Sequence, residues 1–238
     1  MADFCTRDSK RVVVPMTQQS FYKDPKKVRD ETNVIKTKWG YVVEPVSKLV
    51  GLPADIIYAF IKIESNGDPK AIGGGISYGL MQINLDTATS VFFRELNNKR
   101  LTNGEYNYLK LGLRKAGSNP NKIDLANLKK DKKGNYIKVP NFFSKKEVLT
   151  PEINVLLASM FVKELIDITH DADNRARMDK VITIYNTGFK TQQMAKKFQG
   201  STDQLIARVP DITKRYIKKF VGKNGIIDSV SVNKILVI

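Results

Sequence analysis

The sequence has little of the chemistry on which many enzymes depend. Cys5 is the only cysteine among the 238 residues, and His170 is the only histidine. A single cysteine excludes an internal disulfide and a cysteine-cluster metal site. A single histidine leaves almost no material for a Ser-His-Asp triad or a histidine-based zinc site. We therefore expect no metal and no cofactor, and an enzyme that works mainly with carboxylates, hydroxyls, amides and lysines.

Long hydrophobic runs are also missing. No run approaches the roughly 18 apolar residues that a membrane-spanning helix needs, so we expect no membrane span. Residues 1–10 have no apolar stretch after a basic one, so we expect no secretory signal. If the target lies outside a cytoplasm, another component must carry the protein there. Apolar residues make up 42% of the chain, which excludes wholesale disorder and is enough for a core.

Negative charge is scarce. The chain has 40 Lys and Arg against 24 Asp and Glu, a net charge of +16. Such a surface should attract polyanions: nucleic acid, anionic lipid or an anionic cell wall. Residues 97–149 contain 13 of the basic residues and 4 of the acidic ones, which is over half the net charge. We interpret this stretch as a basic surface insertion.

The pattern along the chain predicts a mainly α protein with three parts. Residues 1–40 are mixed and turn-prone, and we interpret them as an N-terminal arm. Residues 41–222 form a helical domain that contains 97–149 as a small β or irregular insertion. Residues 223–238 alternate partly and predict a strand-like tail, whose apolar run 235–238 should pack on the domain or pair with another protein.

Apolar residues at helical spacing, together with capping and breaking residues, indicate the helices of the domain. The expected helices cover residues 41–50, 53–64, 79–95, 106–113, 150–168, 176–186, 201–207 and 210–221.

Three short motifs follow one another in a meaningful order: Glu64-Ser65, then Gly79-Leu80-Met81-Gln82-Ile83-Asn84, then Tyr185-Asn186-Thr187-Gly188. In these residues the chain resembles the soluble lytic transglycosylase (SLT) family, which shares its α-helical fold with goose-type lysozyme. Each motif alone is a weak signal, but all of them in this order are a strong one. The resemblance implies a lysozyme-like fold for the domain.

Two further segments support the resemblance. Thr150-Pro151-Glu152-Ile153-Asn154 resembles the helix start of the family with its Asn, and Thr213-Lys214-Arg215-Tyr216-Ile217 resembles its late Thr-x-x-Tyr-Val segment. The sequence of residues 75–84 is most similar to that of the specialised transglycosylases of secretion machines and phage virions. Two residues depart from the pattern: Ile212 stands where a glutamate is usual, and Thr187 replaces an alanine.

Glu64 is the candidate catalytic residue. Breaking a glycosidic bond at neutral pH requires a protonated acid beside the leaving oxygen. A carboxyl at the end of an apolar helix stays protonated because desolvation disfavours its charged form, which can raise a glutamate pKa to about 6. Most glycosidases have a second carboxylate, but the motifs contain none; Asp68 and Asp86 are only nearby candidates.

The resemblance implies how one acid is enough. The substrate's N-acetyl group assists cleavage of the β-1,4 bond between N-acetylmuramic acid (MurNAc) and N-acetylglucosamine (GlcNAc) in peptidoglycan glycan strands. Glu64, now a base, then activates the C6 hydroxyl of the sugar to give a 1,6-anhydroMurNAc end. By position in the motifs, the resemblance assigns substrate binding to Ser65, Met81, Gln82, Tyr185, Asn186 and Tyr216.

Several of these residues also have a structural alternative. Ser65 can cap a turn in place of holding Glu64 or substrate, and Met81 can be core packing in place of a groove wall. Gln82 and Asn186 can be structural amides in place of lining the sugar groove. Tyr185 can be a core residue, although its phenol is expected to hydrogen-bond Glu64.

Three functions remain open. The first is a phage-encoded lytic transglycosylase for wall penetration or lysis, located in a virion or in the host periplasm and cell wall, with other virion or secretion-apparatus proteins as partners. The second is a lysozyme of the same fold that hydrolyses the same bond with water. The third is a basic structural or nucleic-acid-binding virion protein on an inactive lysozyme-like scaffold. The intact Glu64 and its motif partners favour an enzyme, so nucleic acid is not the expected partner.

Overall fold

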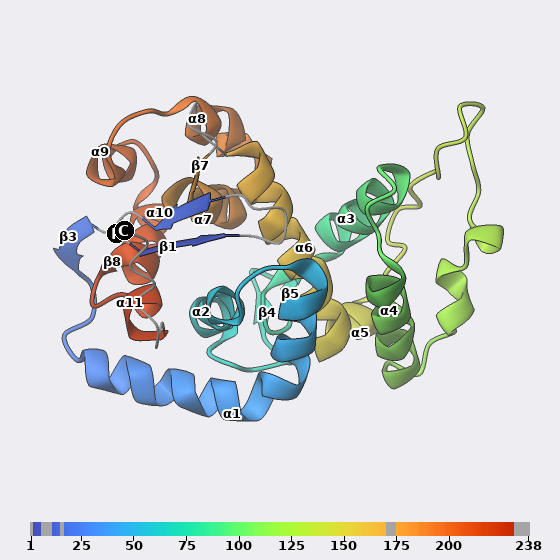
Figure 1. The fold of residues 1–238 in the computed structure, drawn as a ribbon, viewed down its shortest axis with the longest axis horizontal. Helices are drawn as coiled ribbons and strands as arrows, with labels where there is room; N and C mark the ends of the chain where they lie inside the picture. Colours follow the sequence, from blue (N-terminus) through green and yellow to red (C-terminus); the bar gives the residue numbers. More distant parts are fainter. Residues whose placement is uncertain (1, 6–10, 15–16, 170–174, 231–238) are drawn as a thin grey trace. The chain divides into compact units, whose positions relative to one another are not determined.

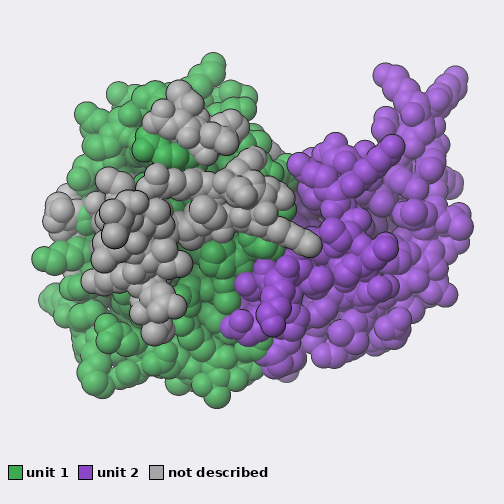
Figure 2. All heavy atoms as spheres, viewed as in Figure 1, with its two compact units in different colours: residues 1–40, 51–63, 162–238 green, residues 41–50, 64–161 purple. Residues whose placement is uncertain are grey.

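The computed structural model describes residues 2–5, 11–14, 17–169 and 175–230. The chain divides into two compact units. Unit 1 comprises residues 1–40, 51–63 and 162–238, and unit 2 comprises residues 41–50 and 64–161 (Figure 2). Among the helices of the described ranges, none is both long enough and apolar enough to cross a membrane.

Helices dominate the chain, and the predicted mainly α class is confirmed (Figure 1). The α-helices are α1 (Pro25–Val50), α2 (Ala54–Ser65), α3 (Leu85–Asn97), α4 (Asn103–Lys115), α5 (Lys145–Val148), α6 (Pro151–Ile168), α7 (Met178–Thr187), α8 (Gln192–Lys197), α9 (Thr202–Ala207), α10 (Asp211–Val221) and α11 (Ile226–Val230). The 3-10 helices are η1 (Pro120–Ile123), η2 (Leu125–Asn127) and η3 (Gly188–Thr191). The strands are β1 (Ala2–Cys5), β2 (Arg11–Val14), β3 (Thr17–Ser20), β4 (Ile72–Gly73), β5 (Ser77–Tyr78), β6 (Ile83–Asn84), β7 (Arg175–Arg177) and β8 (Gly222–Lys223).

In unit 1, strands from the N-terminal part of the chain pair with strands from its C-terminal part. Strand β2 pairs antiparallel with β1 and parallel with β7, and β3 pairs parallel with β8. The rings of Phe60 and Phe220 lie 5.0 Å apart, so α2 and α10 meet in the core of this unit. Helix α10 also packs along α7. Aromatic rings therefore fix the helices that carry the late sequence motifs.

Unit 2 contains the three-stranded antiparallel sheet β4-β5-β6 and an aromatic core. The rings of Phe92, Phe93, Phe142 and Phe143 form a cluster of five ring pairs whose centres lie 5.2 to 5.5 Å apart. The ammonium of Lys122 lies 4.7 Å from the centre of the Phe142 ring. The basic stretch 97–149 thus shares a packed core with α3.

The predicted N-terminal arm needs correction. Residues 25–40 are the first part of α1, which continues without a break through the predicted boundary at residue 41. Val28, Ile35 and Trp39 are at most 5% exposed, and their spacing places them on one helix face. Charged residues between them hide this stripe in the sequence. The helix predicted over 79–95 also starts later, at Leu85, with Asn84 as its N-cap.

The strand-like tail is wrong for residues 226–230, which form α11. Ile226, Ile227 and Val230 are all buried, and the spacing i, i+1, i+4 is that of a helix face. The alternation that suggested a strand begins only at Val230. Residues 231–238, with the apolar run 235–238, lie outside the described residues.

Capping residues define several helix ends. Thr102 and Glu105 form a capping box at the start of α4, and Ser201 and Gln204 form one at the start of α9. Helix α1 ends at Val50, where Gly51 adopts φ 72°.

Candidate functional site

Glu64 is the second-last residue of α2, and its side chain is half-buried. The helix is apolar around most of its circumference, and residues 56–61 are buried. It ends at Ser65 because Asn66 and Gly67 adopt φ angles of 52° and 83°, which cannot continue a right-handed helix. The sequence therefore places a carboxyl where a buried helix reaches the surface, as predicted.

Ser65 connects the end of α2 to the second motif. Its Oγ donates to the carbonyl of Leu80 at 2.8 Å and accepts from the N–H of Gly67 at 3.2 Å. The hydroxyl thus caps the turn and also holds the backbone of the loop 79–82. Its predicted role in holding Glu64 or substrate stays a prediction.

Gln82 stabilises the same loop from inside. Its Nε2 donates to the carbonyls of Ala71 at 2.9 Å and Gly79 at 2.7 Å, while Gln82 itself adopts φ 48°. Both amide protons are therefore directed to the backbone, and the side chain is half-buried. This contact matches the structural alternative for Gln82; a direct contact with the sugar stays a prediction.

Asn154 of α6 fixes the loop from the other side. Its Oδ1 accepts from the N–H of Met81 at 2.8 Å, and its Nδ2 donates to the carbonyls of Tyr78 at 2.7 Å and Val148 at 2.9 Å. A Cβ at Gly79 would lie 2.5 Å from this Nδ2, and Gly79 has φ 77°, so only glycine fits. Sequence reasoning gave Asn154 no role, although its place in the Thr150–Asn154 motif was the available signal.

The prediction that Met81 binds substrate needs correction. Its side chain is 0% exposed, and its Sδ lies 3.9 Å from the hydroxyl of Ser159. A completely buried thioether fills the core and cannot form a groove wall. Met81 therefore follows its structural alternative.

The third motif lies in unit 1. The ring of Tyr185 packs 4.7 Å from that of Phe60. Asn186 is exposed, and its Oδ1 accepts from the hydroxyl of Thr213 at 3.0 Å, while Tyr216 is 8% exposed. The hydrogen bond between Thr213 and Asn186 joins the third motif to the late Thr-x-x-Tyr segment. The hydrogen bond predicted from Tyr185 to Glu64 and the substrate contacts of Asn186 and Tyr216 stay predictions.

The two departures from the family pattern have different surroundings. Thr187 donates its hydroxyl to the carbonyl of Thr183 at 2.7 Å, a bond within α7 that alanine could not form. Ile212 is 74% exposed in the first turn of α10. Among the described residues, nothing explains an apolar side chain at this exposed position.

The nearby acids have other partners. Asp68 is exposed and accepts from the N–H of Lys70 at 2.9 Å. Asp86 is exposed and pairs with Lys138 at 2.5 Å. Within the described ranges, no group of three or more His, Cys, Asp or Glu side chains is arranged to hold a metal ion.

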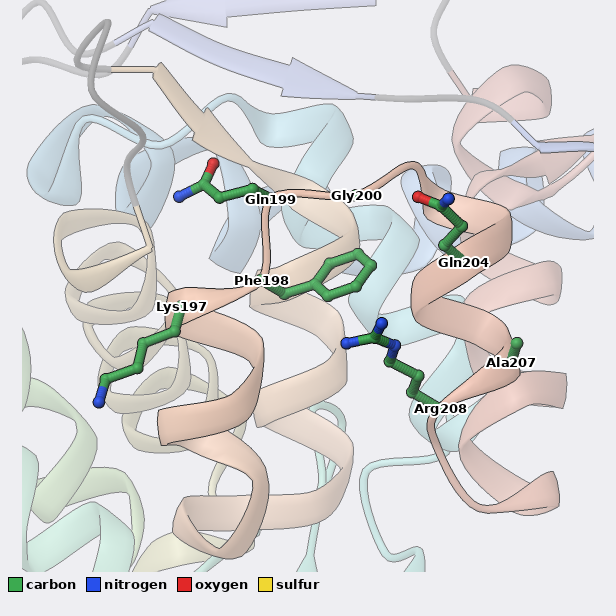
Figure 3. A pocket seen from close by; sticks show the side chains of 7 residues that line it. All are labelled: Lys197, Phe198, Gln199, Gly200, Gln204, Ala207 and Arg208. Carbon is green, nitrogen blue, oxygen red and sulfur yellow. The ribbon is translucent and has the colours of Figure 1, made fainter.

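A pocket of about 400 Å³ lies elsewhere in unit 1 (Figure 3). The guanidinium of Arg208 lies over the ring of Phe198, 5.1 Å from its centre, while the side chains of Lys197 and Gln199 point away. The lining residues include none of the predicted site residues. The residues that line it are Lys197, Phe198, Gln199, Gly200, Gln204, Ala207 and Arg208.

Comparison with known proteins agrees with the site in unit 2. Residues 46–113 match the family model described as "Transglycosylase SLT domain". This segment contains Glu64, Ser65 and the loop 79–82, and it ends within α4. No curated protein matches the chain. The match supports a lytic-transglycosylase type of activity on peptidoglycan in general, and residues 46–113 of this chain are similar to the transglycosylase SLT domain family.

Proposed function

We propose that the protein is a lytic transglycosylase that cleaves the MurNAc–GlcNAc β-1,4 bond of peptidoglycan, with Glu64 as both acid and base. One observation carries the proposal. The hydrogen bond from Ser65 to the carbonyl of Leu80 holds the end of α2, where Glu64 lies, to the loop 79–82. Both parts lie inside the segment that matches the SLT family.

The reaction needs one carboxyl in two protonation states. Protonated Glu64 donates its proton to the glycosidic oxygen, and the C1–O bond breaks with assistance from the N-acetyl oxygen of MurNAc. The Glu64 carboxylate then takes the proton of the C6 hydroxyl as O6 bonds to C1. This step restores the acid and consumes no water. An internal hydroxyl has the advantage of proximity over a free water molecule.

The positions of the other acids support this reaction over hydrolysis. Asp68 is bonded to the backbone of Lys70, and Asp86 is paired with Lys138. Neither exposed carboxylate is arranged as a buried nucleophile or as a base that orients water.

Product analysis tests the proposal. Purified peptidoglycan should be digested with the full chain, treated with borohydride and analysed by mass spectrometry. We expect muropeptides with anhydro ends that resist reduction. Ends that reduce normally would identify a hydrolase of the same fold and direct attention to Asp68 or Asp86. Intact glycan strands would contradict both activities.

The setting of the reaction is part of the same proposal. A net charge of +16 suits an anionic cell wall. We propose action at the host periplasm or wall as part of a phage particle, on the similarity of residues 75–84 to virion transglycosylases. Detection of the protein in purified particles by mass spectrometry would test this setting; its absence from them would contradict it.

A further inference from the structure

A β-hairpin of unit 2, residues 129–139, forms a projection that we call the basic finger. In Figure 1 it is the yellow-green loop that extends beyond α3 and α4. The N–H of Ile137 donates to the carbonyl of Lys129 at 2.9 Å, and Lys130 pairs antiparallel with Tyr136. The finger has no part in the proposed reaction.

The turn at the tip is ordered by its own acid. The Oδ1 of Asp131 accepts from the N–H of Lys133 at 2.8 Å and from that of Asn135 at 2.9 Å. Gly134 adopts φ 84°, a conformation that glycine allows at no steric cost. A turn that is already formed loses little conformational entropy when it binds a partner.

Helix α3 holds the base of the finger. The side-chain amide of Asn97 bonds both backbone groups of Tyr136: its Oδ1 accepts from the N–H at 2.7 Å, and its Nδ2 donates to the carbonyl at 3.0 Å. Lys138 donates to Asp86 at 2.5 Å and to Ser90 at 2.7 Å. The finger is therefore a supported projection that presents its tip in a fixed direction relative to α3.

All five lysines of the finger are exposed. Lys138 is paired with Asp86 at the base, and the four nearer the tip are Lys129, Lys130, Lys132 and Lys133. Lys130 lies over the ring of Tyr136, 4.5 Å from its centre. In the part of the chain that the structure describes, Lys129, Lys132 and Lys133 form no ion pair. Asp131 is the only acid within residues 129–139. The finger thus combines a dense positive charge with a single carboxylate that is directed to the turn.

Apolar side chains lie among these lysines. Ile137 is 45% exposed and Val139 is 47% exposed, and Leu125 in the neighbouring η2 is 48% exposed. Exposed apolar area raises the free energy of a protein in water by about 25 cal/mol for each Å². We propose that the basic finger docks on the surface of an anionic lipid bilayer, with the lysines at the headgroups and Ile137 and Val139 at the acyl boundary.

The apolar residues decide between a bilayer and an anionic wall polymer. A hydrated polymer would be attracted by the lysines, but it would leave Ile137 and Val139 in water. A bilayer interface takes up both kinds of side chain, since lysine stems lie along apolar surface while the ammonium stays at the headgroups. Each lysine close to an anionic leaflet strengthens binding by roughly fivefold.

Vesicle binding by the full chain tests the inference without any peptidoglycan, so its result is independent of the proposed function. The probe is a vesicle of phosphatidylcholine with phosphatidylglycerol, compared with a pure phosphatidylcholine vesicle. We expect binding only to the anionic vesicle. The combined change of Lys129, Lys130, Lys132 and Lys133 to Gln should weaken binding by at least about twentyfold.

Two further variants make the test specific. Changing Lys23, Lys27, Lys196 and Lys197 to Gln removes the same charge from exposed positions of unit 1 and should weaken binding by less than about threefold. Ile137→Ser with Val139→Ser keeps every charge and should weaken vesicle binding by about five- to tenfold, while binding to a soluble anionic polymer stays the same.

Equal losses in the two lysine variants would overturn the inference, because net charge alone would then explain binding. Binding to the polymer but not to the vesicle would overturn it in favour of a wall polymer. Self-association that is lost on changing Ile137 and Val139, without vesicle binding, would overturn it in favour of a second copy of the chain.

Discussion

The segments that carry the predicted site residues use their polar side chains in opposite ways. In unit 2, Ser65, Gln82 and Asn154 direct their side chains to backbone groups and fix the loop after Glu64. In unit 1, Asn186 is exposed, and the one hydrogen bond of its side chain within the described ranges is with Thr213. Inward side chains determine the shape of a site, whereas an exposed amide can meet a ligand. A matching motif residue can therefore be essential without touching substrate.

Changing Glu64 should give the largest effect on activity. Glu64→Gln keeps the shape of the side chain but cannot donate a proton, so we expect a loss of about a thousandfold or more in the rate of wall cleavage, with an unchanged thermal midpoint. Turbidity of a peptidoglycan suspension measures the rate, and circular dichroism measures the fold. Asp203→Asn, which removes an exposed carboxylate from α9, is the control and should behave as the parent protein. Rapid clearing by a folded Glu64→Gln protein would refute the assignment.

Removing the amide of Asn154 should reduce stability and activity together. Asn154→Ala leaves two buried backbone groups and one part-buried group without their partner, and we expect a loss of about 3 kcal/mol in the free energy of unfolding and of about a hundredfold in activity. Urea denaturation measures the first and turbidity the second. Asn107→Ala, at an exposed position of α4, is the control and should change the free energy of unfolding by less than about 0.5 kcal/mol. An active, fully stable Asn154→Ala protein would contradict the view that the side chain of Asn154 is needed to fix the loop after Glu64.

The exposed amide should behave in the opposite manner. Asn186→Ala should lower activity by about tenfold, because a hydrogen bond to substrate is lost, and should leave the thermal midpoint within about 2 °C. The release of soluble products measures the activity, and calorimetry measures the thermal midpoint. A large loss of stability with normal activity per folded molecule would show that Asn186 is a structural amide held by Thr213.

Glu147 is a buried carboxylate of the basic stretch 97–149. Replacing it should lower stability without changing activity, and only at pH values above the acidic range. Desolvation opposes its charged form, but the backbone N–H of Ser144 and the ammonium of Lys122 outweigh it and hold the pKa of Glu147 below its usual value. A lowered folded-state pKa stabilises the protein above the unfolded pKa, and this contribution disappears as pH falls through the folded pKa. Glu147→Gln should therefore cost about 1–2 kcal/mol at pH 7 and little at pH 3. Urea denaturation at both values checks this, and an equal cost at the two would contradict it.

Local signals in the sequence were enough for most helices. The apolar stripe of α2, the capping box at Thr102 and the position of Glu64 at a helix end could all be read directly. The start of α1 and the whole of α11 could not, because charged residues or a short length hide their apolar faces. The role of Asn154 was also hidden, since its contact with Met81 joins residues 73 positions apart. Sequence patterns describe neighbours along the chain better than such distant pairs.

The dependence of the loop on Asn154 has a consequence for the order in which the protein becomes functional during synthesis. The segment that matches the SLT family ends at residue 113, and α6 is made only after it. Until Asn154 has left the ribosome, the N–H of Met81 and the carbonyl of Tyr78 lack their partner, and the loop after Glu64 has no support from α6. A nascent chain that carries the whole family match therefore still lacks the contacts by which Asn154 fixes the loop after Glu64.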